Sequence, residues 1–279
     1  MAVPRRSTAL RCCKLRGSLT DRPARPAAGE RDVRVEVADV SLIGDRDENQ
    51  DWVAVASTDD AVLLVAMDGM GGHVDGGRAA ETGCRTLLGL FAAQPKPLFD
   101  PQGFLHLGLG RAHAEVVALG GGLPLDLRPR ATCAVCLVQR GEAWWAHIGD
   151  SRVYHFRGGA VRTRTRDHSH VEQLLREGSI HEDEVRGHPL RNYVECCLGG
   201  EPALPEMSLS GRVPLADGDV LLVCTDGVWT HLRDAELAAC WMPGARDCRE
   251  TLQELASAAV RANAPHSDNA SAAVLCWRA

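Results

Sequence analysis

The chain has 279 residues, of which 45% are hydrophobic and 24% charged, the balance of an ordinary globular protein rather than a disordered one. Its longest unbroken apolar run covers residues 61–67, far fewer than the roughly 20 residues that a membrane-spanning helix needs. The net charge of −6 argues against a general nucleic-acid-binding protein, because such proteins normally carry a basic face.

The first 31 residues differ in composition from the rest of the chain. They hold eight Arg or Lys side chains against two acidic ones, and they lack the continuous apolar segment of a secretory signal. This composition suits a transit-like segment, a nucleic-acid-binding arm or a solvated tail. We expect residues 1–31 to be a disordered extension, or the product of a start codon assigned too early, and residues 32–279 to form one folded domain.

The cysteines predict neither a disulfide framework nor a zinc site. Cys133 and Cys136 form a C-x-x-C motif, and no second motif of this kind completes a set of four ligands. An odd number of cysteines, 11, and the lack of an export signal favour reduced thiols and a cytoplasmic location.

The first half of the folded part alternates between short strands and longer helices. Apolar alternation predicts strands over 33–43, 52–56 and 61–67, and apolar residues at helical spacing predict helices over 77–91 and 104–119. Strands follow over 133–138, 143–148 and 153–157, and Gly158-Gly159 is typical of a hairpin turn into a further strand over 160–166.

The segment 167–200, which we call the flap segment, is polar and rich in histidine. We interpret it as a long surface connection with one helical patch at 171–176. Strands are predicted again over 207–213, 220–225 and 270–277, with helices over 234–240 and 247–262, and with Asp217-Gly218 as a hairpin turn before the second of these strands. Most of the predicted strands follow one another as hairpins, and the helices are separate from them in the sequence. This order predicts an α+β fold of mostly antiparallel sheets packed as a sandwich.

Two apolar strands end in the same dipeptide, as Asp68-Gly69 and as Asp226-Gly227. Asp-Gly is a common hairpin turn, but neither pair is followed by a partner strand. Carboxylates at the ends of central strands can instead converge at one sheet edge, where they favour hard cations such as Mg²⁺, Mn²⁺ or Ca²⁺. Asp51, Asp150 and Asp268 are further candidates at strand or turn boundaries, and Gly69 leaves room for its carbonyl to approach a metal.

These motifs, taken in order, resemble the PPM-type (type 2C) metal-dependent serine/threonine protein phosphatases, in their compact bacterial form. The resemblance covers about residues 33–279. The matching segments are Gly44-x-Arg46-x-x-Asn49-Gln50-Asp51, Asp68-Gly69-Met70-Gly71-Gly72-His73, Gly149-Asp150-Ser151-Arg152-Val153-Tyr154, Asp167-His168-Ser169, Thr225-Asp226-Gly227-Val228 and Ser267-Asp268-Asn269.

The resemblance implies a β-sandwich with helices on both faces and a centre of two Mg²⁺ or Mn²⁺ ions at one end. Asp68 matches the carboxylate that bridges both metals, and Gly69 matches a carbonyl ligand. Asp226 and Asp268 match the other aspartates that bind the metals directly. Asp68 and Asp226 are therefore the residues that we expect to be essential for catalysis.

The resemblance also assigns the residues around the two metals. Asp51 matches an aspartate that holds water at the centre, and Asp150 matches a ligand of a third, weaker metal. Arg46 matches the arginine that binds the substrate phosphate, and its guanidinium can form a two-pronged contact that Lys would not reproduce. Without the neighbouring motifs, Arg46 would be interpreted as an ordinary surface arginine.

The sequence departs from the family pattern at two positions. Gln50 stands where many members carry Glu, and Met70 stands where animal members carry a histidine proposed as general acid. Because Met70 cannot donate a proton, the candidates for protonating the leaving group are His73 and water bound at the metals. The histidines of the flap segment (His168, His170, His181 and His188) are interpreted as polar surface residues rather than ligands.

Two other functions fit the sequence less well. A dinucleotide-binding loop would need glycine at position 74, which is Val74, and no phosphate-binding G-x-x-x-x-G-K-[ST] motif exists in the chain. A catalytically silent phosphoprotein-binding scaffold is less favoured because all the matched aspartates are present. The resemblance implies phosphoprotein substrates and a cognate serine/threonine kinase, and we expect a monomer that binds no nucleic acid.

Overall fold

The structure is a computed structural model that describes residues 34–70, 75–185, 187–242 and 247–278. These residues all belong to one compact unit, Val33–Ala279. The predicted extension over 1–31, together with His73 and Val74, lies outside the described residues. None of the helices in the described ranges is both long and apolar enough to cross a membrane.

Two antiparallel sheets form the centre of this unit. One has the strand order β1-β13-β12-β7-β8 and the other the order β10-β6-β5-β3-β2, with β11 also paired to β6. The strands of the first sheet are β1 (Arg34–Leu42), β7 (Arg152–Arg157), β8 (Ala160–Arg164), β12 (Asp219–Cys224) and β13 (Ala270–Arg278). Those of the second are β2 (Asp51–Ser57), β3 (Ala61–Asp68), β5 (Cys133–Gln139), β6 (Glu142–Ile148), β10 (Ser208–Leu209) and β11 (Val213–Pro214).

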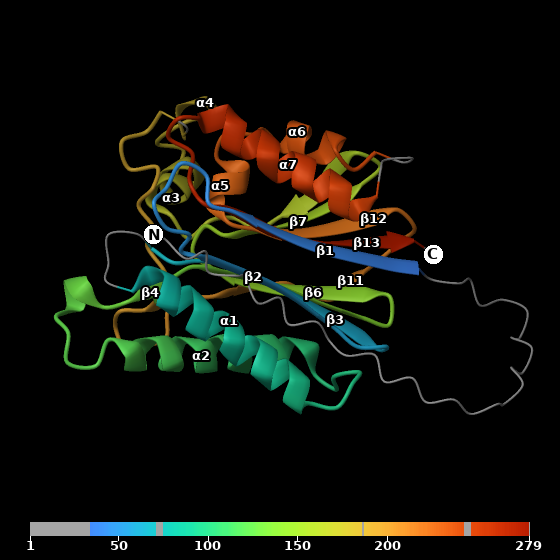
Figure 1. Ribbon diagram of the computed structural model, residues 1–279, viewed down its shortest axis with the longest axis horizontal. Helices are drawn as coiled ribbons and strands as arrows, with labels where there is room; N and C mark the ends of the chain where they lie inside the picture. The colour runs from blue at the N-terminus through green and yellow to red at the C-terminus, as the bar shows by residue number, and fades with distance from the viewer. Residues whose placement is uncertain (1–33, 71–74, 186, 243–246, 279) are drawn as a thin grey trace, which may run out of the picture. The chain divides into compact units, whose positions relative to one another are not determined.

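Helices cover the outer faces of both sheets, as Figure 1 shows. Helices α1 (Gly76–Ala93) and α2 (Pro101–Leu119) lie on the second sheet, whereas α6 (Asp234–Ala239) and α7 (Cys248–Asn263) lie on the first. The side chain of Asp100 accepts a hydrogen bond from Gly103 N, which caps α2 just before the proline that begins it. The predicted α+β sandwich with helices on both faces is confirmed.

The central strands are apolar throughout because each of their faces meets a different core. In β3, Leu63, Val65 and Met67 pack under α1 and α2, while Val62, Leu64 and Ala66 pack between the two sheets. Side chains alternate along a strand, so one strand supplies both cores. The same alternation places Cys133 and Cys136 in different cores.

Several short elements connect these layers. A small pair, β4 (Arg130–Ala131) and β9 (Leu198–Gly199), joins the flap segment to the rest of the unit. The flap segment contains the predicted helical patch as α3 (His170–Arg176), and also a second short helix, α4 (Glu182–Val185). The remaining short elements are η1 (Leu125–Leu127) and α5 (Asp226–Trp229).

The predicted hairpin at Asp217-Gly218 is wrong. The expected strand over 207–213 is instead two short pieces, β10 and β11, that both pair with β6 of the second sheet. Strand β12, which follows the turn, lies in the first sheet between β13 and β7. Asp217-Gly218 therefore carries the chain from one sheet to the other. The hairpin at Gly158-Gly159 is confirmed, because β7 and β8 are paired across it.

A buried ion pair fixes the start of β12, and it generates a stability prediction. Asp219 is fully buried and accepts hydrogen bonds from Arg157 Nη2 at 2.7 Å and Ala216 N at 2.8 Å, while His155 Nε2 lies 3.0 Å from its carboxylate. Burial alone would raise the pKa of Asp219, but the contacts with Arg157 and His155 outweigh burial and hold this pKa well below its ordinary value.

We expect Asp219→Asn to lower the free energy of unfolding by roughly 2–3 kcal/mol at pH 7, because it leaves Arg157 without its partner charge. Since the folded-state pKa is depressed, this stabilisation is present above pH ~4 and is lost as the pH falls below that value. Urea unfolding of both proteins at pH 7 and again well below pH 4 measures the difference. The exposed turn substitution Asp60→Asn is the control, and an equal effect of both substitutions would contradict the prediction.

Candidate active site

Five aspartates from both sheets meet at one end of the sandwich. Asp51 begins β2 and is the register partner of Asp68, which ends β3. Asp226 is the first residue of α5 and is separated from the end of β12 by Thr225 alone, and Asp268 lies two residues before β13. Asp150 lies in the turn between β6 and β7. The carboxylates at the strand ends therefore converge at one edge, as predicted.

A cavity of about 600 Å³ opens over these strand ends. Its wall contains the predicted residues Arg46, Asp68, Gly69, Asp150, Asp226 and Asp268. Asp51 lies behind this wall, where its Oδ2 accepts a hydrogen bond of 2.8 Å from the Thr225 hydroxyl. The structure thus brings together all seven of the site residues predicted from the sequence.

Burial and mutual repulsion make the ionised form of these carboxylates unfavourable. Burial, followed by the negative charge of Asp226, raises the pKa of Asp68 and of Asp150 well above the ordinary value. Burial also raises the pKa of Asp51. For Asp226, burial and then the charge of Asp268 raise the pKa to about 7. The site holds more negative charge than its own side chains compensate.

The donor set fits a divalent cation. In the described part of the chain, no three His, Cys, Asp or Glu side chains already converge on one point as tightly as metal ligands do. The carboxylates raise one another's pKa, so a positive charge among them would stabilise their ionised forms. Asp150 Oδ1 is buried without a hydrogen-bond partner. Buried, unpaired carboxylate oxygens are the ligands that Mg²⁺ and Mn²⁺ prefer.

The two glycines that follow the strand-end aspartates are required by close packing. A Cβ at Gly69 would lie 2.2 Å from the carbonyl oxygen of Gly76 and 2.7 Å from that of Gln50. A Cβ at Gly227 would lie 2.0 Å from the carbonyl oxygen of Asn269. Each glycine lets a second segment approach the backbone beside an aspartate, which fixes where that aspartate lies.

Arg46 reaches the cavity from the loop between β1 and β2. Its Nη2 lies 2.7 Å from Asp268 Oδ2, and 57% of the side chain is exposed. Asn269 holds this loop in place, because its amide donates to Ile43 O and Glu48 O and its Oδ1 accepts from Gln50 N. The motif Ser267-Asp268-Asn269 thus supplies both the ion-pair partner of Arg46 and the anchor of its loop.

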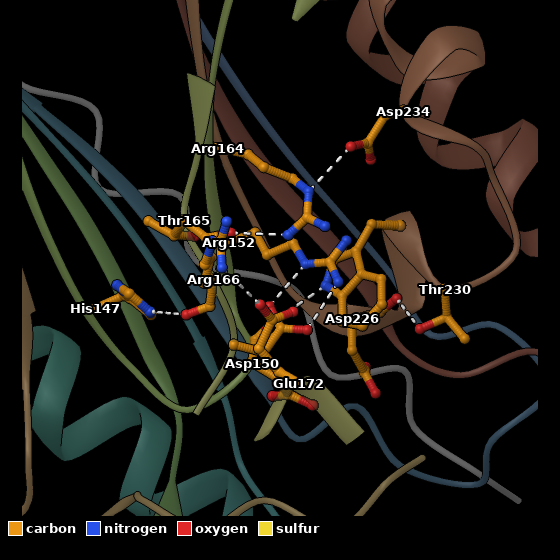
Figure 2. A network of polar contacts seen from close by, with 12 residues as sticks. His147, Asp150, Arg152, Arg164, Thr165, Arg166, Glu172, Asp226, Thr230 and Asp234 are labelled. Carbon is orange, nitrogen blue, oxygen red and sulfur yellow. Dashed lines mark hydrogen bonds and ion pairs between the residues drawn. The ribbon is translucent and has the colours of Figure 1, made fainter. Parts of the chain in front are cut away.

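A polar network behind Asp150 was not predicted from the sequence. Arg152 forms two hydrogen bonds with the carboxylate of Asp167, at 2.8 and 2.7 Å, and its guanidinium stacks 3.3 Å above the ring of Trp229. The indole of Trp229 donates to Asp150 O at 3.1 Å. Figure 2 shows this network beside Asp150 and Asp226. Arg152 and Asp167 lie in quoted motifs, but nothing in the sequence indicates that Trp229 joins them.

The flap segment also contributes to the cavity wall. Asn192 and Val194 line the cavity, and no signal in the sequence distinguishes these two residues from their neighbours. Among the described residues that line the cavity there is no histidine. Of the flap histidines, His181 is exposed, as predicted for a surface residue. His168 is half-buried and stacks on His147, with the ring centres 4.5 Å apart.

The family model for protein phosphatase 2C matches residues 40–266, which is most of the chain. The chain belongs to this family. Membership identifies it as a metal-dependent protein phosphatase and confirms the resemblance seen in the sequence.

Known proteins similar to this chain agree with the assignment. It is 30% identical over 196 residues to a serine/threonine phosphatase of Listeria innocua, an alignment that spans 69% of this chain and 77% of the relative. The solved structure of a Streptococcus agalactiae serine/threonine phosphatase has a TM-score of 0.77 and 26% identity, over 87% of this chain and 99% of that one. The solved structure of the catalytic domain of the phosphatase PstP, in complex with two manganese ions, has a TM-score of 0.73 and 26% identity. This match covers 88% of this chain and 100% of that one.

The packing at Gly69 generates a prediction with a matched control on α1. Gly69→Ala places a methyl group against two backbone carbonyls, so we expect a loss of at least about 2 kcal/mol of stability and a larger loss of activity. Gly89→Ala adds a methyl group with nothing within 4 Å in a helix, so it should be neutral or stabilise by up to about 1 kcal/mol. Thermal unfolding and turnover of both variants test this, and an intact Gly69→Ala enzyme would contradict it.

Proposed function

We propose that this enzyme hydrolyses phosphoserine and phosphothreonine in proteins, using two Mg²⁺ or Mn²⁺ ions held by Asp68, Asp226, Asp268 and the carbonyl of Gly69. Asp51 would orient water beside the ions, and Asp150 would bind a third ion more weakly. The observation that carries the proposal is the convergence of buried, mutually repelling carboxylates in one open cavity beside an exposed arginine.

The rigid strand ends explain how the chain would hold such a centre. Divalent cations bound there would supply a water molecule that loses a proton near neutral pH, and positive charge for the phosphate oxygens. Asp51 and Asp68 are paired across β2 and β3, so their separation is fixed by the sheet register. The Thr225 hydroxyl orients one oxygen of Asp51. These contacts keep the carboxylates in position before the substrate binds.

Arg46 would bind the substrate phosphate. One of its Nη atoms contacts Asp268, and the rest of its exposed guanidinium can donate to a phosphate dianion in the cavity. This pairing with Asp268 also ties the arginine to a proposed metal ligand, so metal and phosphate would be held by one connected unit.

The departing serine or threonine oxygen must receive a proton. Met70 carries none, and the described lining residues include no histidine. The proton would therefore come from water in the cavity or from His73, which lies outside the described residues. A cognate serine/threonine kinase, a monomeric state and a cytoplasmic location stay predictions.

The first test is metal dependence. We expect turnover of a phosphothreonine peptide only with added Mg²⁺ or Mn²⁺, and its loss in EDTA, because the proposed ligands are all oxygen atoms. Asp68→Asn and Asp226→Asn should each lower kcat by roughly 10²-fold or more, while Asp60→Asn should not change it.

The same variants distinguish loss of chemistry from loss of fold. In metal-free enzyme at pH 8, removing one of the mutually repelling charges should leave stability unchanged or higher, because a raised folded-state pKa makes ionisation costly. Undiminished kcat in either variant would refute the role of that residue. A wild-type enzyme that binds phosphopeptide without turnover would favour the silent scaffold.

The second test concerns Arg46. Arg46→Ala should lower kcat/KM for a phosphopeptide by about tenfold to a hundredfold, because a charge-assisted contact with phosphate in an open cavity is lost. Arg46→Lys should recover only part of this, since Lys cannot form the two-pronged contact. Arg34→Ala, an exposed arginine on β1, is the control. If calorimetry shows that Arg46→Ala loses Mn²⁺ affinity while KM is unchanged, Arg46 organises Asp268 rather than the substrate.

A further inference from the structure

A second cavity of about 720 Å³ adjoins the catalytic cavity. The two share Asp150, Asn192 and Asp226 in their walls, so a segment bound at the catalytic centre has access to both. The second cavity lies between the flap helices α3 and α4 on one side and the end of α5 and the start of α6 on the other.

Apolar side chains line part of the flap side of this cavity. Val171, Leu175 and Val185 line it, and among the described residues none of the three belongs to a hydrophobic core cluster. Trp229 and Leu232 face the cavity from the α5–α6 side. Apolar side chains that line a cavity instead of filling a core provide a surface for an apolar part of a ligand.

The arginines at the bottom of the cavity already have anionic partners. Arg152 is bonded twice to Asp167, and Arg164 Nε donates to Asp234 Oδ2 at 3.0 Å. Figure 2 shows the guanidinium of Arg164 directed at Asp234. Arg233, also in the wall, pairs with Glu236 at 3.2 Å, whereas Arg191 is exposed. The charges of Arg152, Arg164 and Arg233 are therefore compensated within the protein.

Acidic side chains are left over in the same wall. Glu172 on α3 is 8% exposed, and its nearest ion-pair contact, with Arg166 Nη1, is 3.9 Å long, beyond hydrogen-bond distance. Burial and then the charge of Asp167 raise the pKa of this carboxyl group, and the charges of Arg164, Arg166 and Arg152 offset part of that rise. Glu182 and Asp183 are exposed at the rim and form no ion pair within the described ranges. Glu172, Glu182 and Asp183 outnumber Arg191 in this wall, so an added cation is favoured there.

We propose that this cavity binds a Lys or Arg side chain of the phosphoprotein substrate, located a few residues from the phosphorylated one. The apolar stem would pack against Val171, Leu175 and Trp229, and the charged head would reach Glu172. An acidic residue would be repelled by Glu172, Glu182 and Asp183, and a purely apolar one would gain no charge contact with them. The inference rests on the proposed phosphatase function, because it assigns sequence preference to the same site.

The experiment compares phosphothreonine peptides that carry a single Arg at each of the three positions before or after the phosphothreonine, in an otherwise Ala-based sequence. With Mn²⁺ present, we expect kcat/KM to rise about tenfold for Arg at one or two of these positions. Glu172→Gln should abolish that gain and leave turnover of para-nitrophenyl phosphate unchanged, because this small substrate does not reach the second cavity. Glu177→Gln, which removes a charge just after α3 but outside the cavity, is the control.

A second variant keeps the test independent of Glu172. Leu175→Lys places a cation at the cavity wall, on a half-buried helical position that tolerates a long side chain, and should repel the Arg peptides selectively. Equal kcat/KM for all peptides, with para-nitrophenyl phosphate still hydrolysed, would overturn the subsite and leave the phosphatase function intact. A proportional loss of all activities in Glu172→Gln would show a structural role and overturn it as well. Failure of every substrate with wild-type enzyme and Mn²⁺ would instead overturn the proposed function.

Discussion

Carboxylates that are both buried and close together repel one another, and a protein keeps such a cluster only where the surrounding backbone prevents it from spreading apart. Here Asp51, Asp68 and Asp226 lie at the ends of strands whose two faces are both packed. The packing free energy of the cores on either side of each sheet offsets the electrostatic repulsion among these carboxylates. The sandwich is therefore as much a condition for the site as the aspartates themselves.

The same constraint explains why small residues surround the cluster. Gly69 and Gly227 let neighbouring carbonyls come closer than any side chain would allow, and Asn269 ties the Arg46 loop to the start of β13. These contacts join segments more than 200 residues apart in sequence, namely the β1–β2 loop and the turn before β13. Position at the site is thus determined by backbone packing, and the charged side chains depend on it.

The sequence was informative wherever a local pattern had a single physical cause. Alternation located the long strands, and the lack of a partner strand after Asp68-Gly69 and Asp226-Gly227 separated these pairs from ordinary turns. The same dipeptide misled at Asp217-Gly218, because flanking apolar runs do not tell which sheet each strand joins. Long-range proximity was equally invisible: the Sγ atoms of Cys248 and Cys276 lie 3.1 Å apart, while the obvious pair, Cys133 and Cys136, points into different cores.

The proposed metal ligands and the proposed substrate subsite lie on structurally different parts of the chain. The aspartates lie on strands and tight turns, where register and packing fix each oxygen. The second cavity is bounded by short helices of the flap segment, where Leu175 is half-buried and Glu182 is exposed, and neither belongs to one of the three core clusters. A change at Leu175 or Glu182 therefore costs little stability, whereas a change at Gly69 disturbs two strands at once. On this scaffold, preference for a substrate sequence can vary while the metal centre stays unaltered.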